Sequence, residues 1–201
     1  MDKPAGTGYS GTRWAVVEEV ASSLATWLAG NGPDGKPRDP DGIDIVVFQG
    51  NGISTFRNQR DNVAVGRIFE SETPFGGTPL HKALEFVVDD FVGQKEEVAP
   101  TFAIVLTDGW PSNDEEPVRQ LKRAADFMKS RGLTDEAFAV WFIQVGEDSQ
   151  GTAYLKWLDS DDEDGKGAQI RTVLGYDLVD VTPIDKVKPP IENMIIAAIN
   201  G

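Results

Sequence analysis

The stretch that decides the fold is Phe-Gly-Gly-Thr-Pro-Leu, residues 75–80, together with Thr-Asp-Gly-Trp-Pro, residues 107–111. The first stretch ends in a threonine hydroxyl just before a segment with helical spacing, and the second places Asp108 after the apolar run 102–106. In open α/β sheets, ligands bind beyond the carboxyl ends of the strands. A hydroxyl and a carboxylate that both emerge there can share one polar site. Together with water, they suit a small hard cation such as Mg²⁺.

Length and composition are those of one folded domain. The chain has 201 residues, of which 40% are hydrophobic and 26% are charged, which is enough for one sizeable core. Residues 1–11 are rich in Gly, Pro, Thr and Ser and predict an N-terminal loop. Residues 12–201 predict the α/β body. We therefore expect a single domain over residues 1–201.

The charge balance and the absence of cysteine exclude several classes of protein. A net charge of −14 argues against nucleic acid and anionic membranes as partners, because long-range electrostatics would repel them. No apolar run approaches the roughly 20 residues of a membrane span, and residues 1–6 lack the apolar core of a secretory signal. Without cysteine, disulfides, thiolate nucleophiles and Cys-based zinc sites are unavailable. Together these features predict a cytoplasmic protein.

Strand and helix patterns alternate along the body. Apolar runs predict strands at residues 43–48, 101–106, 137–145 and 170–174, and an alternating run predicts an antiparallel edge strand at 53–58. Helical spacing predicts helices from Thr12, at 61–69, at 80–92, after residue 113, at 150–158 and at 191–199. Such alternation implies right-handed parallel crossovers. We predict a Rossmann-like, doubly wound α/β fold, with a mostly parallel sheet covered by helices on both faces.

The paired stretches resemble a known family. Residues 75–80 before a helix, followed by an apolar strand that ends in Leu-Thr-Asp-Gly at residues 106–109, look like the von Willebrand factor type A (vWA) domain. Residues 13–14, Arg-Trp, and residues 142–146, Phe-Ile-Gln-Val-Gly, are also similar to intracellular members of that family. The resemblance spans nearly the whole chain. It implies a Rossmann-like fold that carries a metal-ion-dependent adhesion site.

Three loops build that site in the family. The resemblance implies Thr78 as the hydroxyl ligand and Asp108 as the carboxylate, often acting through water, with Mg²⁺ or Mn²⁺ as the cation. The first loop should supply Asp-x-Ser-x-Ser, which this sequence does not contain. In one alignment Asp2 is the aspartate of that motif, with proline and glycine at the serine positions. In the alignment that we favour, Met1 is the methionine that closes the motif, and the motif itself lies upstream.

Both alignments leave out the first strand of the family's sheet, which is central. Its loss would expose unpaired backbone groups on both neighbouring strands. Three explanations stay open at this point. The sequence is truncated from a longer protein or its start is misassigned; the strand at 43–48 pairs directly with that at 101–106; or a second copy of the chain lends a strand. The third explanation predicts a homo-oligomer.

The candidate site residues also have simpler structural roles. Thr78 can cap the helix that follows it, and Asp108 is an ordinary turn residue before a glycine. Trp110 either packs against a neighbouring helix or is exposed as a contact residue, and tryptophan is enriched among binding hot spots. We take Trp110, Ser112 and Gly77 as the candidate partner-binding residues.

The leading functional hypothesis is a noncatalytic protein-interaction module. The resemblance implies a bound cation whose open position is completed by an Asp or Glu of a protein partner, and partners that belong to multi-protein assemblies, including AAA+ ATPases. One alternative is a metal-assisted hydrolase with the cation at Asp108, although no His or Lys is placed as an evident general base. Another is a truncated vWA domain that binds partners without metal, through Trp110 and the surrounding loops.

Overall fold

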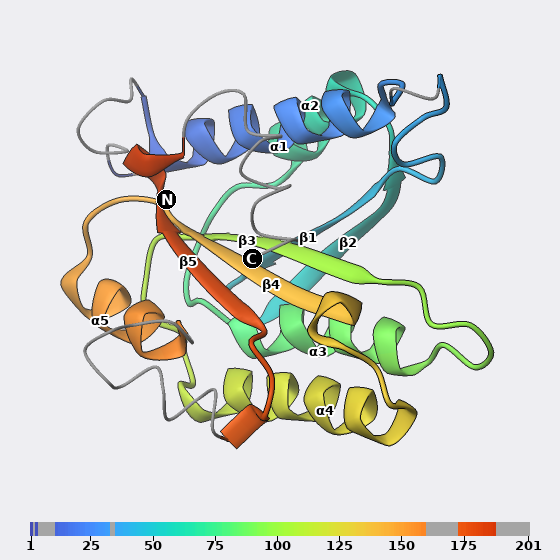
Figure 1. Cartoon of the computed structure of the whole chain (residues 1–201). Coiled ribbons are helices and arrows are strands. Elements are labelled where there is room, and N and C mark those ends of the chain that lie inside the picture. Colours follow the sequence, from blue (N-terminus) through green and yellow to red (C-terminus); the bar gives the residue numbers. More distant parts are fainter. Residues whose placement is uncertain (2, 4–10, 33–34, 160–172, 188–201) are drawn as a thin grey trace.

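The computed structural model describes residues 1, 3, 11–32, 35–159 and 173–187 (Figure 1). Its helices are α1 (Arg13–Ala29), α2 (Asn62–Ser71), α3 (Leu80–Val92), α4 (Glu115–Arg131) and α5 (Ser149–Leu158). Its strands are β1 (Ile43–Gln49), β2 (Gly52–Gln59), β3 (Thr101–Thr107), β4 (Phe138–Gln144) and β5 (Val179–Pro183). Two short 3-10 helices, η1 (Asp135–Ala137) and η2 (Ile184–Lys186), precede β4 and follow β5.

The described strands form two ladders. β1 and β2 make an antiparallel hairpin around a two-residue turn at Gly50 and Asn51. β3, β4 and β5 are parallel in that order, and β3 pairs with β4 along its whole length. Figure 1 shows α1 and α2 on one face of the strands and α3 and α4 on the other. The predicted α/β fold, with a parallel sheet flanked by helices, is therefore confirmed.

Local sequence signals explain where the helices begin and end. The Thr12 hydroxyl accepts a hydrogen bond from the N–H of Ala15 at 3.2 Å, and the Asp61 carboxylate accepts one from Ala64 at 2.7 Å. Each side chain satisfies a backbone donor that the first helical turn leaves free. α4 ends at Gly132, whose φ of 66° lies in the left-handed region that glycine adopts without strain.

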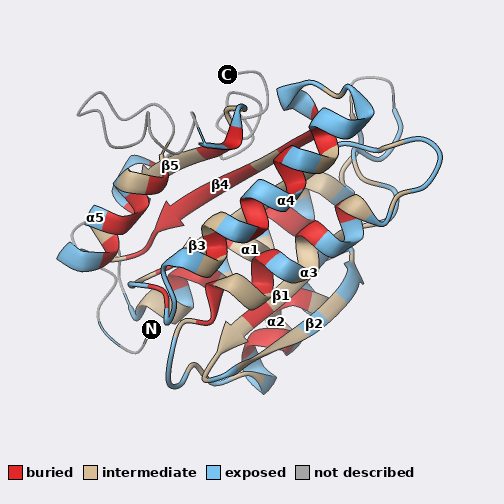
Figure 2. Cartoon of the chain, turned by 90° about the horizontal axis from the view of Figure 1, so that it is seen from below, coloured by how far each residue is buried: buried red, intermediate tan, exposed pale blue. Residues whose placement is uncertain are grey.

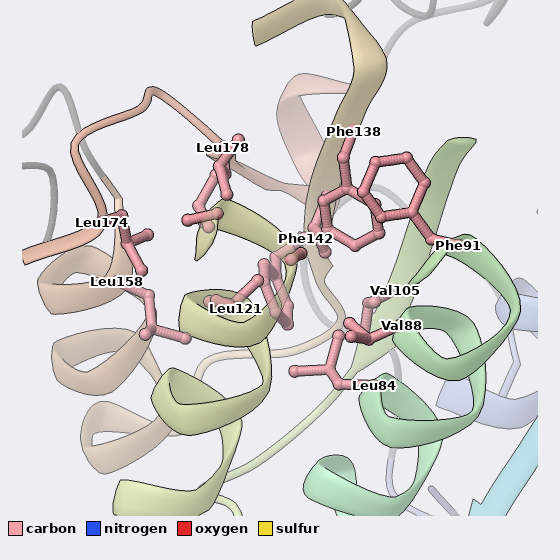
Figure 3. Packing of buried hydrophobic residues seen from close by; sticks show 14 of the residues in the cluster. Leu84, Val88, Phe91, Val105, Leu121, Phe138, Phe142, Leu158, Leu174 and Leu178 are labelled. Carbon is pink, nitrogen blue, oxygen red and sulfur yellow. The ribbon is translucent and has the colours of Figure 1, made fainter. Parts of the chain in front are cut away.

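The core centres on β4. All of its residues except Ala139 are buried, and Figure 2 shows buried positions along the strand and on the sides of α3 and α4 that face it. On one side, Phe138 packs against Phe91 of α3 with ring centroids 4.9 Å apart. The main cluster, drawn in Figure 3, also contains Leu84, Val88, Val105, Leu121, Phe142, Leu158, Leu174 and Leu178. On the other side, Trp141 and Ile143 pack against α1.

The structure departs from the sequence prediction in three places. β1 and β3 do not pair with each other among the described residues, so the direct pairing of 43–48 with 101–106 is wrong for this part of the chain. The near-continuous apolarity of residues 43–48 predicts a strand that is buried on both faces, yet Val47 is the one buried residue of β1. The prediction also missed β5 and placed a strand at 170–174. Residues 173–174 of that range are helical.

Some predictions fall beyond the described part of the chain. Residues 170–172, the helix at 191–199 and Asp2 lie outside it. Of the helices that the structure does describe, none combines the length and the apolarity that a membrane crossing requires.

Candidate functional site

Residues 75–79 and 108–114 form neighbouring loops at the carboxyl end of the strands. The backbone N–H of Thr78 donates to the Ser112 hydroxyl at 2.9 Å, and the N–H of Ser112 donates to the Thr78 carbonyl at 2.9 Å. The two loops are thus joined by a reciprocal pair of hydrogen bonds. Ser112 is predicted from the sequence as a contact residue for a partner. Within the chain, it positions Thr78 through these two hydrogen bonds.

Glycines allow the first loop to approach the β1–β2 turn. The N–H of Gly50 donates to the Phe75 carbonyl at 2.8 Å. A Cβ on Gly76, whose φ is 73°, would lie 2.9 Å from the Gly50 Cα, and a Cβ on Gly77 would lie 2.7 Å from the Ser112 hydroxyl oxygen. A side chain at either position would push the loops apart, so the Gly-Gly pair is required by close packing. Close packing within the chain therefore explains why residue 77 is glycine, and no contact with a partner protein is needed to explain it.

Asp108 is held by two cationic groups. Its Oδ2 lies 2.9 Å from the Met1 ammonium nitrogen and 3.2 Å from Nη1 of Arg13. The three side chains are 21%, 15% and 12% exposed for Asp108, Met1 and Arg13. Burial alone would raise the pKa of the Asp108 carboxyl, but the Met1 ammonium, and then Arg13, hold that pKa below its ordinary value. The carboxylate is therefore ionised and already neutralised by its neighbours.

Backbone hydrogen bonds bring these two cations to Asp108. The N–H of Trp14 donates to the Met1 carbonyl at 3.2 Å, and the N–H of Arg13 donates to the Lys3 carbonyl at 2.9 Å. Residues 1 and 3 are therefore tied to the first turn of α1. The Met1 side chain packs in the cluster between α1 and β1. Sequence reasoning could not find this arrangement, because the residues that pair with Asp108 are 107 and 95 positions away.

The predicted metal ligands were Thr78, Asp108 and Asp2. Thr78 and Asp108 do lie at the same edge, since the Thr78 hydroxyl oxygen is 4.0 Å from where a Cβ on Gly109 would be. The described residues hold no group of three or more His, Cys, Asp or Glu side chains that could bind a metal. A Mg²⁺ or Mn²⁺ ion at Asp108 would also have to compete with the guanidinium of Arg13, which lies 3.2 Å from Oδ2. This donor set does not fit a divalent cation as it is arranged here.

Trp110 is both packed and exposed. Its ring lies 5.2 Å from that of Tyr154 in α5, at 52°, and 43% of its surface is exposed. Tyr154 is itself buried, and its hydroxyl donates to the Asp114 carbonyl at 3.1 Å. The two alternatives for Trp110 are therefore both realised: one side packs on α5 and the other faces solvent.

Phe75 is a surface feature that sequence reasoning missed. It is 67% exposed, although its ring edge contacts Gly50 at the β1–β2 turn. The sequence does contain a signal for it: Phe75 is a large aromatic residue directly before Gly-Gly, and the segment between the neighbouring helices is too short to form a helix that would bury it. Phe75 and Trp110 stand on the two loops that Ser112 joins. They give this edge two large apolar side chains in contact with solvent.

Comparison with known proteins finds a remote structural likeness. No family model matches the chain, and no curated protein shows significant similarity. Among solved structures, the chain is similar to the manganese-loaded TRAP protein of Plasmodium vivax, with 16% identity over 88% of this chain and a TM-score of 0.46. The match covers 65% of that protein chain, which is less than two thirds of its length. This likeness carries no argument about ligands or partners.

Proposed function

We propose that this chain is a noncatalytic protein-interaction module that contacts a protein partner through the loops 75–79 and 108–114. The observation that carries the proposal is Trp110, a tryptophan that is 43% exposed at the carboxyl edge of the strands. Large exposed aromatics on a rigid support are typical of binding hot spots. In α/β folds this edge is also where binding sites occur.

The support beneath Trp110 is a pair of packed aromatic side chains. Tyr154 stacks against it and in turn lies 5.7 Å from the ring of Trp157. Burial, and then the charge of Asp114, raises the pKa of the Tyr154 phenol, so this group stays neutral and stays hydrogen-bonded within the fold. A contact residue that is already ordered loses little conformational entropy when a partner binds.

The proposed contact does not use a metal. Arg13 lies 3.2 Å from Asp108 and supplies positive charge at the place where a cation would otherwise bind. The two vWA-like loops are present and joined, which supports the resemblance, but the given sequence does not contain the Asp-x-Ser-x-Ser motif of the family's first loop. The vWA-like mode of contact through a bridging cation is therefore the second candidate.

The test is capture of partners from cell extract by the immobilised chain, with three variants compared. Trp110→Ala and Phe75→Ala remove the exposed aromatics, and Val63→Ala removes another exposed apolar side chain, which lies on α2 and is 58% exposed. We expect Trp110→Ala to weaken capture of a specific protein about thirtyfold, the scale of a hot spot, and Val63→Ala to leave it unchanged. Equal capture by the chain and both aromatic variants would refute the proposal.

Two further measurements separate the alternatives. Capture should persist in a chelator, and calorimetry should show no Mg²⁺ or Mn²⁺ binding in the micromolar range. Micromolar binding that Thr78→Ala weakens would replace this proposal with the metal-bridged mode. Turnover of a phosphoester that Asp108→Ala abolishes would instead establish the metal-assisted hydrolase.

A further inference from the structure

The loop after β3 and the first turn of α4 hold two solvent-exposed carboxylates. Residues 107–118 contain four Asp or Glu residues and no Lys or Arg. Two of the four carboxylates are paired, one with Arg13 at 3.2 Å and one with Arg119 at 2.6 Å. The other two belong to Asp114 and Glu115, which are exposed and make no ion pair with another described residue.

These two carboxylates are not used to cap α4. The side-chain oxygen of Asn113 accepts hydrogen bonds from the N–H groups of Glu115 at 3.2 Å and Glu116 at 3.3 Å. Asp114, at the N-cap position, makes no side-chain hydrogen bond to the helix. The helix dipole favours negative charge at this end, which explains why acidic residues are tolerated here. Their oxygens stay available to another molecule.

Trp110 lies beside the acidic start of α4. Its ring packs on Tyr154 with the centroids 5.2 Å apart, and the Tyr154 hydroxyl donates to the Asp114 carbonyl at 3.1 Å. Tyr154 therefore links the indole to the residue that carries the first of the two carboxylates. Because 43% of Trp110 is exposed, the loop presents an aromatic surface and negative charge to solvent at the same place.

The surroundings leave this place negatively charged. Lys156 follows Tyr154 in α5 by two positions, and residues at that spacing do not share a face of a helix. The net charge of −14 adds to the local negative potential. We call Trp110, Asp114 and Glu115 the acidic aromatic patch.

We propose that the acidic aromatic patch binds an arginine side chain from an exposed segment of a protein partner. The guanidinium stacks on Trp110, and its N–H groups donate to Asp114 and Glu115. Tryptophan is the aromatic residue that binds cations best, and arginine is the cation found there more often. A planar guanidinium can stack through its face and donate through its edge at once. Nucleic acid and anionic lipid carry the wrong charge for this patch.

This inference rests on the proposed function and specifies the chemistry of the partner. The charge that it requires is opposite to that of the metal-bridged mode, in which the partner supplies an Asp or Glu. The sign of the charge on the bound segment therefore separates the two modes of contact.

The probe is the peptide Gly-Arg-Gly-Arg-Gly, titrated into the isotope-labelled full chain and followed by NMR. Salt at about 0.15 M screens general attraction to the net charge. The readout is the indole N–H resonance of Trp110, which is assigned by its loss in Trp110→Phe. A matched peptide carries citrulline, the neutral analogue, in place of arginine. We expect it to bind at least about fivefold more weakly, and equal binding by the two peptides would overturn the proposal.

Matched variants of the chain test the two parts of the patch. Glu115→Gln and Glu85→Gln each remove one negative charge, and Glu85 is an exposed residue on α3. We expect arginine-peptide binding about two- to threefold weaker for Glu115→Gln and nearly unchanged for Glu85→Gln. Equal effects would mean general attraction and refute the patch. Trp110→Leu keeps an apolar side chain without the π face, and we expect about threefold weaker binding; unchanged binding would refute the stacking.

The outcomes distinguish this inference from the proposed function on which it rests. If Trp110→Ala weakens capture from extract but the arginine peptide binds no better than the citrulline peptide, the interaction module stands and the arginine partner is refuted. Tighter binding of Gly-Glu-Gly-Glu-Gly than of the arginine peptide, in the presence of Mg²⁺, would also refute it and favour the metal-bridged mode. If Trp110→Leu fails to fold, Glu115→Gln and the citrulline peptide still decide the question.

Discussion

Replacing Asp108 with asparagine removes the charge that holds residue 1 and the start of α1 against the loop after β3. Exposed ion pairs contribute about 0–1 kcal/mol, whereas removal of one partner from a fully buried pair costs about 3–5 kcal/mol. The side chains here are 21%, 15% and 12% exposed. After allowance for solvent screening, we expect a loss of about 2 kcal/mol in the free energy of unfolding at pH 7. For a domain of this length that corresponds to a melting temperature lower by about 4–8 °C.

The sign of the change in unfolding free energy distinguishes loss of the ion pair from relief of general repulsion, because the net charge of the chain is −14. Removing one negative charge should by itself relieve repulsion and stabilise the chain slightly. The control is Asp126→Asn, which breaks an exposed pair with Lys122 at 2.8 Å, and we expect at most about 0.5 kcal/mol from it. Urea unfolding followed by circular dichroism measures both variants. A neutral or stabilising Asp108→Asn would refute the argument.

The pH dependence gives a second check on Asp108. The carboxyl has a lower pKa in the folded state than in the unfolded chain, so its contribution is fully present above the ordinary pKa of about 3.9. It is lost as the pH falls through the folded value. The difference between the wild-type chain and Asp108→Asn should stay constant from about pH 7 to 5 and shrink below about pH 4. A difference that grows in acid would contradict the assigned pairing.

Three other substitutions test the fold and the site. Gly77→Ala places a Cβ 2.7 Å from the Ser112 hydroxyl oxygen; we expect a loss of about 1–3 kcal/mol by urea unfolding, with the amide of Thr78 losing its protection from exchange. Phe142→Ala empties a fully buried position beneath α4 and should cost about 3–5 kcal/mol by the same assay. Thr12→Ala removes the cap of α1 and should cost about 1 kcal/mol, while Thr12→Ser should restore most of it.

Features with a local cause could be predicted from the sequence. The helix from Thr12 is confirmed because its cap lies within three residues of the donor that it satisfies. The end of α4 at Gly132 is confirmed because the left-handed conformation is a property of that residue. The sequence also predicts that the loops around Thr78 and Asp108 lie close together, because the carboxyl ends of parallel strands lie at the same edge of the sheet.

Features that depend on distant neighbours could not be predicted. β5 is only five residues long and alternates Val179 and Val181 with polar side chains, so it gives a weaker signal than the apolar run at 170–174. The partial burial of β1 depends on which strand lies next to it, not on its own composition. The cations beside Asp108 come from the far end of the chain, and nothing near Asp108 in the sequence indicates them.

The interruption between β1 and β3 also has a consequence for how the native state opens. No ladder of hydrogen bonds connects the β1–β2 hairpin to β3 in the described part of the chain, so α1, α3 and the loop contacts at Gly50 are what couple them. Cooperative units follow contiguous packing and backbone pairing. We therefore expect the hairpin with α2 to open as one sub-global unit, and the β3–β4–β5 body with α4 and α5 to keep its exchange protection longer.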